Sequence, residues 1–306
     1  MRIGFIGLGH LGRHLAMSLV KGGFDVTVHD LNRAAAAKHI AAGAKWAESP
    51  AELARQVDSV FTCLPSPKAT DKVLAGPDGV LSALKPGSTW IENSTNDQAE
   101  ILRLAKLCEA KGINVLEAPV TGGVHTAAEG RITVLVGGEE AVFDKHRPAL
   151  EAIGGKVLHM GPLGSAAVIK VITNMLAFIH LVAGGEALML AKRGGLDLAK
   201  AFHAIQASSG NSFVFETEGQ LVLNGSYDIG FTMDLALKDL GFATDFGRKF
   251  GVPLEVAGLT EQIFIRGRET YGGAAWSTMI VKLLEDALKT PLRAEGFPAT
   301  LNPPEQ

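Results

Sequence analysis

The N-terminal residues combine a short apolar segment, a glycine loop and an amphipathic segment. Ile3 to Ile6 is predicted to be a strand and Leu11 to Lys21 a helix, and the sequence Gly7-Leu8-Gly9-His10-Leu11-Gly12 joins them. In this context the first glycine permits a tight turn, the second lets the backbone approach a pyrophosphate, and the third lets the helix pack against the strand. Amides at the helix N-terminus then face the phosphates. The first 33 residues therefore predict a dinucleotide-binding βαβ unit.

The second predicted strand, Asp25 to His29, ends beside an acidic residue. Asp30 follows it, where a carboxylate can accept hydrogen bonds from both hydroxyls of the adenine ribose of NAD. Arg33 comes shortly after, and an arginine just beyond this strand is how NADP enzymes accommodate the 2′-phosphate. Because Asp30 would repel that phosphate and Arg33 would attract it, we expect NAD, with NADP as the alternative.

The pattern of predicted secondary structure changes near residue 163. Before it, short β-branched runs alternate with amphipathic stretches, as in parallel α/β folds; after Gly161-Pro162-Leu163-Gly164 we expect helices only. The sequence thus predicts an α/β fold with an N-terminal doubly wound Rossmann domain over residues 1–163. A long interdomain helix, Ser165 to Lys192, leads into an all-α domain over residues 164–290. Residues 291–306 carry four prolines, Pro291, Pro298, Pro303 and Pro304, and predict a loosely packed tail.

Composition narrows the class of partner. The formal net charge of -3 and the absence of a basic run argue against nucleic acid and favour a small-molecule ligand. Cys63 and Cys108 lack metal-ligand spacing and are interpreted as reduced packing residues, so no metal is expected. The N-terminus does not have the pattern of a signal peptide, and we expect a cytoplasmic protein.

One apolar segment, Val171 to Ala191, is long enough to suggest a membrane span. It contains Asn174, His180 and Glu186, and a carboxylate near the centre of a bilayer would be costly. We therefore expect no membrane partner and interpret the segment as a helix buried between protein domains.

Lys170 is the candidate acid/base. It lies four residues before Asn174 in a predicted helix, so the two side chains share one face. Oxidation of an alcohol removes a proton from oxygen as hydride leaves carbon, and the reverse reaction returns it. A lysine suits this task when partial burial lowers its pKa toward the working pH, and a neutral amide can hold the reacting oxygen in line.

Four blocks of sequence occur together and in order along almost the whole chain. They are the glycine loop, Glu117-Ala118-Pro119-Val120-Thr121-Gly122-Gly123, the Gly161–Gly164 turn followed by Lys170 and Asn174, and Lys238-Asp239-Leu240. In this order they resemble the β-hydroxyacid dehydrogenase family, which includes 3-hydroxyisobutyrate dehydrogenases and tartronate semialdehyde reductases. The resemblance implies a C-terminal domain like that of 6-phosphogluconate dehydrogenase. We expect exposed apolar faces of the all-α domain to pair with another subunit, which predicts a homodimer or homotetramer.

The same resemblance implies roles for further residues. Thr121, Gly122 and Gly123 correspond to the segment that holds the substrate carboxylate, and two glycines beside a hydroxyl residue at a strand end form an anion-binding nest. Leu64-Pro65 and Ser94-Thr95 resemble segments beside the nicotinamide. Lys238 resembles the family's second lysine near the cofactor.

The predicted function is hydride transfer between NAD(P) and a small 3-hydroxy acid or its semialdehyde, an anionic substrate. Thr121 stands where serine is usual in the family, a mild change that keeps the hydroxyl. Thr173 stands where hydroxyisobutyrate enzymes tend to have asparagine and decarboxylating phosphogluconate enzymes histidine, which disfavours the decarboxylating relatives. His125, Thr126 and Arg131 replace commoner residues, which leaves a sulfonated or dicarboxylic aldehyde as an alternative substrate. A non-catalytic dinucleotide-binding sensor or scaffold is the competing class.

Overall fold

The computed structural model describes residues 1–301 of the chain and divides into two compact units. The first unit comprises Met1–Lys170, and the second begins at Val171. This division falls inside one long helix, α8 (Ser165–Arg193), and therefore later than the boundary predicted at residue 163. Pro303 and Pro304 of the predicted tail lie outside the described residues.

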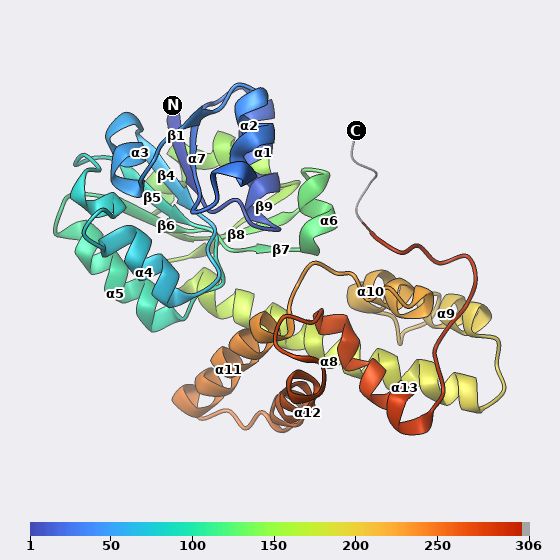
Figure 1. The fold of residues 1–306 in the computed structure, drawn as a ribbon. Coiled ribbons are helices and arrows are strands. Elements are labelled where there is room, and N and C mark those ends of the chain that lie inside the picture. Colours follow the sequence, from blue (N-terminus) through green and yellow to red (C-terminus); the bar gives the residue numbers. More distant parts are fainter. Residues whose placement is uncertain (302–306) are drawn as a thin grey trace. The chain divides into compact units, whose positions relative to one another are not determined.

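The first unit alternates strands and helices (Figure 1). Its strands are β1 (Arg2–Ile6), β2 (Asp25–His29), β3 (Lys45–Trp46), β4 (Ser59–Thr62), β5 (Thr89–Glu92), β6 (Asn114–Glu117), β7 (Val120–Thr121), β8 (Thr133–Gly138) and β9 (Lys156–Gly161). Its helices before α8 are α1 (Gly12–Lys21), η1 (Arg33–Ala36), α2 (Ala37–Ala41), α3 (Pro50–Gln56), α4 (Pro67–Ala75), η2 (Val80–Ser82), α5 (Gln98–Glu109), α6 (Gly123–Ala128) and α7 (Glu140–Ile153).

The strands form one sheet within the described residues, in the order β3-β2-β1-β4-β5-β6-β8-β7, with β9 paired to β8. From β3 to β6 every pairing is parallel, and β8 is antiparallel to both β6 and β7. Strand β1 lies between β2 on one side and β4 on the other, so the order of strands reverses at β1. In doubly wound sheets of this kind, ligands bind at the carboxyl ends of the strands, at that switch point.

Helices cover both faces of the sheet over β1, β2, β4 and β5, whose residues are almost all buried. Ile3 and Phe5 of β1 join a buried cluster with α1 and α7. Ile6 of the same strand joins a second cluster with α3 and α5 on the other face. Gly4 must lack a side chain, because a Cβ there would lie 2.1 Å from a methyl carbon of Leu53 on α3.

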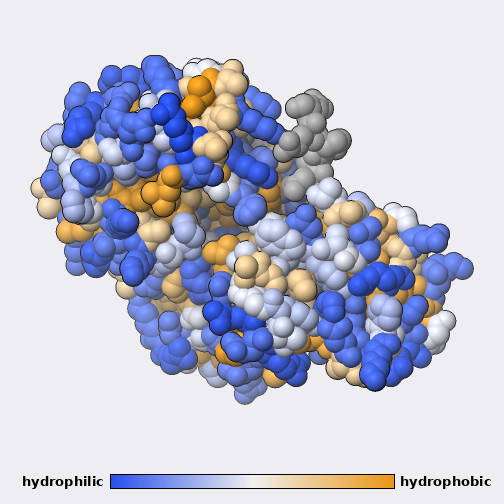
Figure 2. All heavy atoms as spheres, viewed as in Figure 1, coloured by the Kyte–Doolittle hydropathy of each residue, from blue (hydrophilic) through white to orange (hydrophobic). Residues whose placement is uncertain are grey.

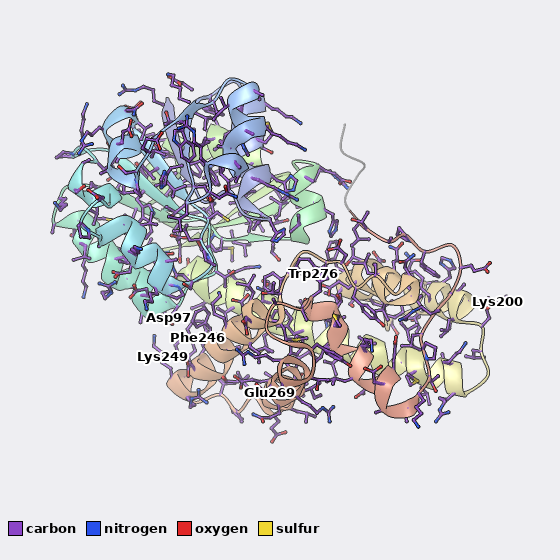
Figure 3. The ribbon with its side chains drawn as sticks, in the orientation of Figure 1. Asp97, Lys200, Phe246, Lys249, Glu269 and Trp276 are labelled. Atoms are coloured by element: carbon purple, nitrogen blue, oxygen red, sulfur yellow. The ribbon has the colours of Figure 1, made fainter. Side chains whose placement is uncertain are left out.

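Several helices of this unit begin at side-chain caps. The Ser49, Ser66 and Asp97 side chains accept hydrogen bonds from amides in the first turns of α3, α4 and α5. Figure 3 labels Asp97 at the start of α5. These caps fix where each helix starts and hence the loop that precedes it.

The second unit is helical, as predicted. After α8 it contains α9 (Leu198–Gln206), α10 (Phe213–Asn224), α11 (Met233–Phe250), α12 (Glu255–Tyr271), η3 (Ser277–Ile280) and α13 (Lys282–Leu288). We did not predict α10 from the sequence. Buried residues occur on most sides of it, including Val214, Phe215, Gly219 and Val222, so it has little of the amphipathic period that identifies a surface helix.

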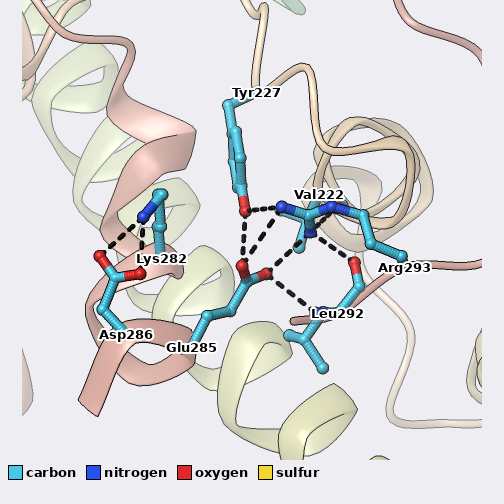
Figure 4. Close-up of polar contacts among 7 residues, drawn as sticks. All are labelled: Val222, Tyr227, Lys282, Glu285, Asp286, Leu292 and Arg293. Carbon is cyan, nitrogen blue, oxygen red and sulfur yellow. Dashed lines mark hydrogen bonds and ion pairs between the residues drawn. The ribbon is translucent and has the colours of Figure 1, made fainter. Parts of the chain in front are cut away.

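The segment after α13 is packed, so the prediction of a loose tail is wrong for residues 292–297. Leu292 is fully buried, and the ring of Phe297 contacts Phe202 at a centroid distance of 5.0 Å. Figure 4 shows the polar network beside it: the Glu285 carboxylate, 4% exposed, accepts hydrogen bonds from the Tyr227 hydroxyl at 2.8 Å and from Arg293 at 3.1 Å. Long-range contacts of this kind have no local sequence signal.

Helix α8 is not the buried helix that we predicted. Its apolar window of 18 residues is only 33% buried within the chain, and by length and composition alone this helix could cross a membrane. The residues left exposed between positions 172 and 190 form a stripe at spacings of three and four: Ile172, Leu176, His180, Ala183, Glu186, Ala187 and Leu190. The space-filling view in Figure 2 shows apolar surface among hydrophilic residues in both units.

The Arg293–Glu285 contact allows a stability test of the C-terminal segment. We expect Arg293→Ala to destabilise the protein by about 2 to 3 kcal/mol, because it leaves the buried Glu285 carboxylate without its cation. Lys282→Ala is the matched control: it breaks an exposed pair with Asp286 (Figure 4), whose effect should stay below about 1 kcal/mol. Urea unfolding measures both, and equal effects would contradict the structural role of residues 292–297.

Candidate active site

The glycine loop has the geometry that the sequence predicts. Gly7 has φ +100°, and a Cβ on Gly12 would lie 2.0 Å from the Gly7 carbonyl oxygen, so both positions require glycine. Gly9 differs: a Cβ there would meet no atom of the protein within 4 Å. Nothing in the fold requires glycine at this position, but a pyrophosphate approaching the backbone would. The loop therefore fits a dinucleotide.

Asp30 lies at the carboxyl end of β2 and is tied to the glycine loop. Its Oδ2 accepts a hydrogen bond from the Leu8 amide at 2.7 Å, and its Oδ1 accepts one from the Asn32 amide at 2.8 Å. Arg33 pairs with Glu48 at 2.8 Å and lies over the ring of Trp46, but both charged side chains are about two-thirds exposed, at 67% and 66%. An exposed pair of this kind contributes little and separates readily.

The ends of β4 and β5 are joined through a buried carboxylate. Glu92 is fully buried; its carboxylate accepts hydrogen bonds from the Thr62 hydroxyl and from the Ser94 amide, both at 2.7 Å. Burial raises the pKa of Glu92 to about 7, although these hydrogen bonds oppose that shift. The Ser94 hydroxyl in turn accepts a hydrogen bond from the Leu64 amide at 2.7 Å. Leu64-Pro65 and Ser94-Thr95 are thereby held together, and Glu92 is a residue that sequence reasoning missed.

Thr121, Gly122 and Gly123 stand at the same edge of the sheet. Because β7 and β6 are both antiparallel to β8, Thr121 ends a strand that runs in the direction of the parallel strands. Gly122 and Gly123 have φ of +126° and +87°, and a Cβ on Gly122 would lie 2.7 Å from the Thr126 hydroxyl. The positive φ at both positions explains why glycine occurs at them, and anion binding at this turn stays a prediction.

Helix α8 begins at this edge because a buried carboxylate binds its first turn. Glu117, the last residue of β6, is 1% exposed and accepts hydrogen bonds from the amides of Gly164 (2.6 Å), Ala166 (2.8 Å) and Ala167 (3.0 Å). Burial raises the pKa of this carboxyl, and the amides oppose the shift. Lys170 follows in the second turn, about 7.5 Å along the helix from Ser165, and is only 7% exposed. The first unit thus gathers the glycine loop, Asp30, the β4 and β5 ends, the Thr121 segment and the start of α8 at one edge.

The second unit contains a separate polar cluster. The Asn174 amide donates a hydrogen bond to Asp239 Oδ2 at 2.6 Å, and Lys238 donates one to Asp239 Oδ1, also at 2.6 Å. Asp239 is fully buried, so its carboxylate fixes both side chains. Asn174 lies one turn beyond Lys170 on α8, as the sequence predicts. The role of Asp239 was missed, although the block Lys238-Asp239-Leu240 contains it.

The unusual residues after the Thr121 segment occupy different surroundings. His125 is half-buried, and its ring lies close to Gly123, where a Cβ would be 3.0 Å from His125 Cε1. Burial lowers the pKa of His125. Arg131 is 71% exposed and pairs with Glu129. His125 and Arg131 are the two candidates for binding a second anionic group. Of these two, His125 lies against the Thr121 segment, and Arg131 is exposed.

A doubly wound dinucleotide-binding sheet followed by a helical unit defines the class of NAD(P)-dependent dehydrogenases. Two family models match the chain in succession: the NAD binding domain of 6-phosphogluconate dehydrogenase over residues 2–161, and the NAD-binding domain of NADP-dependent 3-hydroxyisobutyrate dehydrogenase over residues 164–284. The chain belongs to the β-hydroxyacid dehydrogenase family, as the sequence blocks predicted, and is an enzyme of the NAD(P)-dependent hydroxyacid dehydrogenase class.

Individual relatives match over nearly their full length. The chain is 36% identical over 286 residues to 2-(hydroxymethyl)glutarate dehydrogenase of Eubacterium barkeri, which covers 93% of this chain and 95% of the relative. A crystal structure of 3-hydroxyisobutyrate dehydrogenase from Salmonella typhimurium has a TM-score of 0.86 and 32% identity, with 92% of this chain and 99% of that one covered. A structure of Psf3 in complex with NADP+ has a TM-score of 0.85 and 25% identity, with 92% and 99% covered.

The contrast between Gly9 and Gly12 gives a test of the loop. Gly12→Ala should lower the stability by about 2 kcal/mol or more, because the new Cβ meets backbone. Gly9→Ala should change stability by less than about 0.5 kcal/mol but weaken NAD binding by about tenfold or more. Thermal unfolding and calorimetric titration with NAD measure the two effects. Unchanged NAD affinity in Gly9→Ala would show that the pyrophosphate does not lie on this loop.

Proposed function

We propose that the enzyme transfers a hydride reversibly between NAD and the hydroxyl-bearing carbon of a small 3-hydroxy acid, with Lys170 as the acid/base. The burial of Lys170 in the second turn of α8 carries this proposal, because Glu117 holds the start of that helix at the ligand-binding edge of the sheet. A lysine in this place can take the hydroxyl proton as the carbonyl forms and return it in the reverse direction.

The other site residues have complementary roles in this proposal. Thr121, Gly122 and Gly123 bind the acid group through a hydroxyl and backbone amides. Asn174 orients the reacting oxygen, and its hydrogen bond to Asp239 fixes the plane of its amide. When bound, the nicotinamide accepts the hydride in oxidation and supplies it in reduction. Lys238, which resembles the family's second lysine near the cofactor, is held by Asp239.

NAD is the preferred cofactor in this proposal. Asp30 is fixed by two backbone amides at the end of β2, and its remaining lone pairs can accept the ribose hydroxyls. The carboxylate of Asp30 would repel the 2′-phosphate of NADP. NADP remains the second candidate, because Arg33 is exposed and because the similar Psf3 structure is described as a complex with NADP+.

A dicarboxylic substrate is favoured by two observations. One relative is named for 2-(hydroxymethyl)glutarate, a dicarboxylate whose hydroxyl carbon stands in the same relation to a carboxylate as in 3-hydroxyisobutyrate. In this chain the half-buried His125 lies beside Gly123, and Gly123 belongs to the segment proposed to bind the first carboxylate. Its imidazole can donate a hydrogen bond to a second acid group.

We also infer that the enzyme is a homo-oligomer. The exposed stripe on α8, from Ile172 to Leu190, has the spacing of a helix that packs against another helix. Because only 33% of its apolar window is buried within one chain, a second copy is the partner that would cover it. Sedimentation as a monomer at micromolar concentration would contradict this inference.

Lys170→Ala tests the central role. We expect the turnover number to fall by about 100-fold to 10,000-fold while the dissociation constant for NAD changes little, since the lysine acts on the proton and not on the dinucleotide. Lys200→Ala, which removes an exposed lysine on α9 (Figure 3), is the matched control and should retain full activity.

The assay follows nicotinamide absorbance with a panel of 3-hydroxy acids, semialdehydes, dicarboxylates and sulfonate analogues, using NADH and NADPH. Retained turnover in Lys170→Ala would refute its role as acid/base. Tight cofactor binding without turnover of any compound would favour the alternative function, a dinucleotide-binding sensor.

A further inference from the structure

Glu92 is a buried carboxylate that the proposed hydride transfer does not use. It ends β5, is fully buried and pairs in register with Thr62 on β4. Its Oε2 accepts a hydrogen bond from the Thr62 hydroxyl and its Oε1 accepts one from the Ser94 amide, each at 2.7 Å. The Thr62 hydroxyl also accepts a hydrogen bond from the Trp90 indole at 2.9 Å. Both carboxylate oxygens thus face hydrogen-bond donors, an arrangement that suits the ionised form.

A proton on this carboxyl would conflict with the arrangement. On Oε1 the proton would face the Ser94 N–H, which is a donor against a donor. On Oε2 it would point at the Thr62 oxygen, whose own hydrogen would then have to turn away from the carboxyl. Burial opposes ionisation and the hydrogen bonds favour it, and the balance brings the pKa of Glu92 to about 7. The carboxyl therefore changes its protonation state near neutral pH.

Ser94 connects Glu92 to the glycine loop. The Ser94 hydroxyl accepts a hydrogen bond from the Leu64 amide at 2.7 Å, so it holds the loop that follows β4. That loop packs against the glycine loop: a Cβ on Gly7 would lie 2.3 Å from the Cys63 carbonyl oxygen and 3.1 Å from the Leu64 side chain. A displacement of Ser94 would therefore change the support of the loop that faces the pyrophosphate.

Two other ionisable groups lie beside Glu92. Burial and the Glu92 carboxylate raise the pKa of the Cys63 thiol to about 12, so this thiol stays neutral. Glu117 pairs in register with Glu92 across β5 and β6, and burial raises its pKa as well. The Thr70 hydroxyl of α4 is uncharged and opposes the rise in the pKa of Glu92. Glu117 is therefore the carboxyl whose titration has to be separated from that of Glu92.

We propose that Glu92 is a proton-sensitive positioning residue: when its carboxylate takes up a proton, the Ser94–Leu64 link to the glycine loop loosens and the dinucleotide binds more weakly. Linkage then requires that NAD binding releases a proton in the pH range in which Glu92 titrates. This proposal rests on the NAD(P) cofactor of the proposed function but not on the substrate or on Lys170.

Calorimetric titration with NAD+ from about pH 6 to about pH 8 tests the proposal. For one proton and a pKa of about 7, wild type should bind NAD+ about tenfold more weakly at the lower pH than at the higher one. Glu92→Gln keeps the side-chain shape but has an NH2 group among the donors, as the protonated carboxyl does. It should bind at every pH about as weakly as wild type does at the lower pH. Titrations in two buffers of different ionisation enthalpy should show proton release in wild type and not in Glu92→Gln.

Infrared difference spectra identify the group that titrates. A band of a protonated carboxyl should appear in wild type as the pH falls through about 7 and should be absent from Glu92→Gln. A band that persists in the variant would assign the titration to Glu117 or another carboxyl and would overturn the proposal.

Ser94→Ala separates the titration from its effect on binding. It keeps the Glu92 carboxyl but removes the hydroxyl that holds Leu64, so the infrared band should still titrate while NAD+ affinity is weak and no longer depends on pH. This variant also serves if Glu92→Gln does not fold.

Two binding results would overturn the proposal. One is equal affinity of wild type for NAD+ at both ends of the pH range. The other is the wild-type pH dependence retained in Glu92→Gln or in Ser94→Ala, which would show that another group is responsible. Failure of wild type to bind NAD+ at any pH would instead refute the cofactor of the proposed function.

Discussion

The structure depends on the buried carboxylate of Glu117 and the helix amides that it binds. Glu117 ends β6 and accepts hydrogen bonds from Gly164, Ala166 and Ala167 at the start of α8. The fold leaves room for it only because residue 137 is glycine, where a Cβ would lie 2.2 Å from Glu117 Oε1. A negative charge at a helix N-terminus is stabilised by the helix dipole as well as by the amides. This contact joins the sheet that binds the dinucleotide to the helix that carries Lys170.

Much of the fold could be predicted because its signals are local. The strand, glycine loop and helix at the N-terminus follow one another directly, and the strand Asp25–His29 was predicted with the observed bounds. The need for glycine at positions 7 and 12 could also be predicted, because it arises from backbone geometry within the loop itself. Helix α10 escaped prediction because burial on most of its sides removes the amphipathic period.

The supporting residues of the site could not be predicted in the same way. Glu92, Glu117 and Asp239 act through contacts with residues distant in sequence, such as Thr62, Gly164 and Asn174. In the sequence alone each is an acidic residue at the end of a strand or within a helix, which is ordinarily solvated. The packing of residues 292–297 likewise depends on Glu285 and Phe202, which no local pattern connects to them.

We infer that Glu117, through the amides at the start of α8, positions Lys170 relative to the bound dinucleotide. Glu117→Gln tests this inference, because it keeps the side-chain shape but places an NH2 group against a helix amide. We expect the turnover number to fall by about 100-fold, as a displacement near 1 Å would produce, with the NAD dissociation constant unchanged. Glu151→Gln, at an exposed position on α7, should have no effect. Wild-type turnover in Glu117→Gln would contradict the claim.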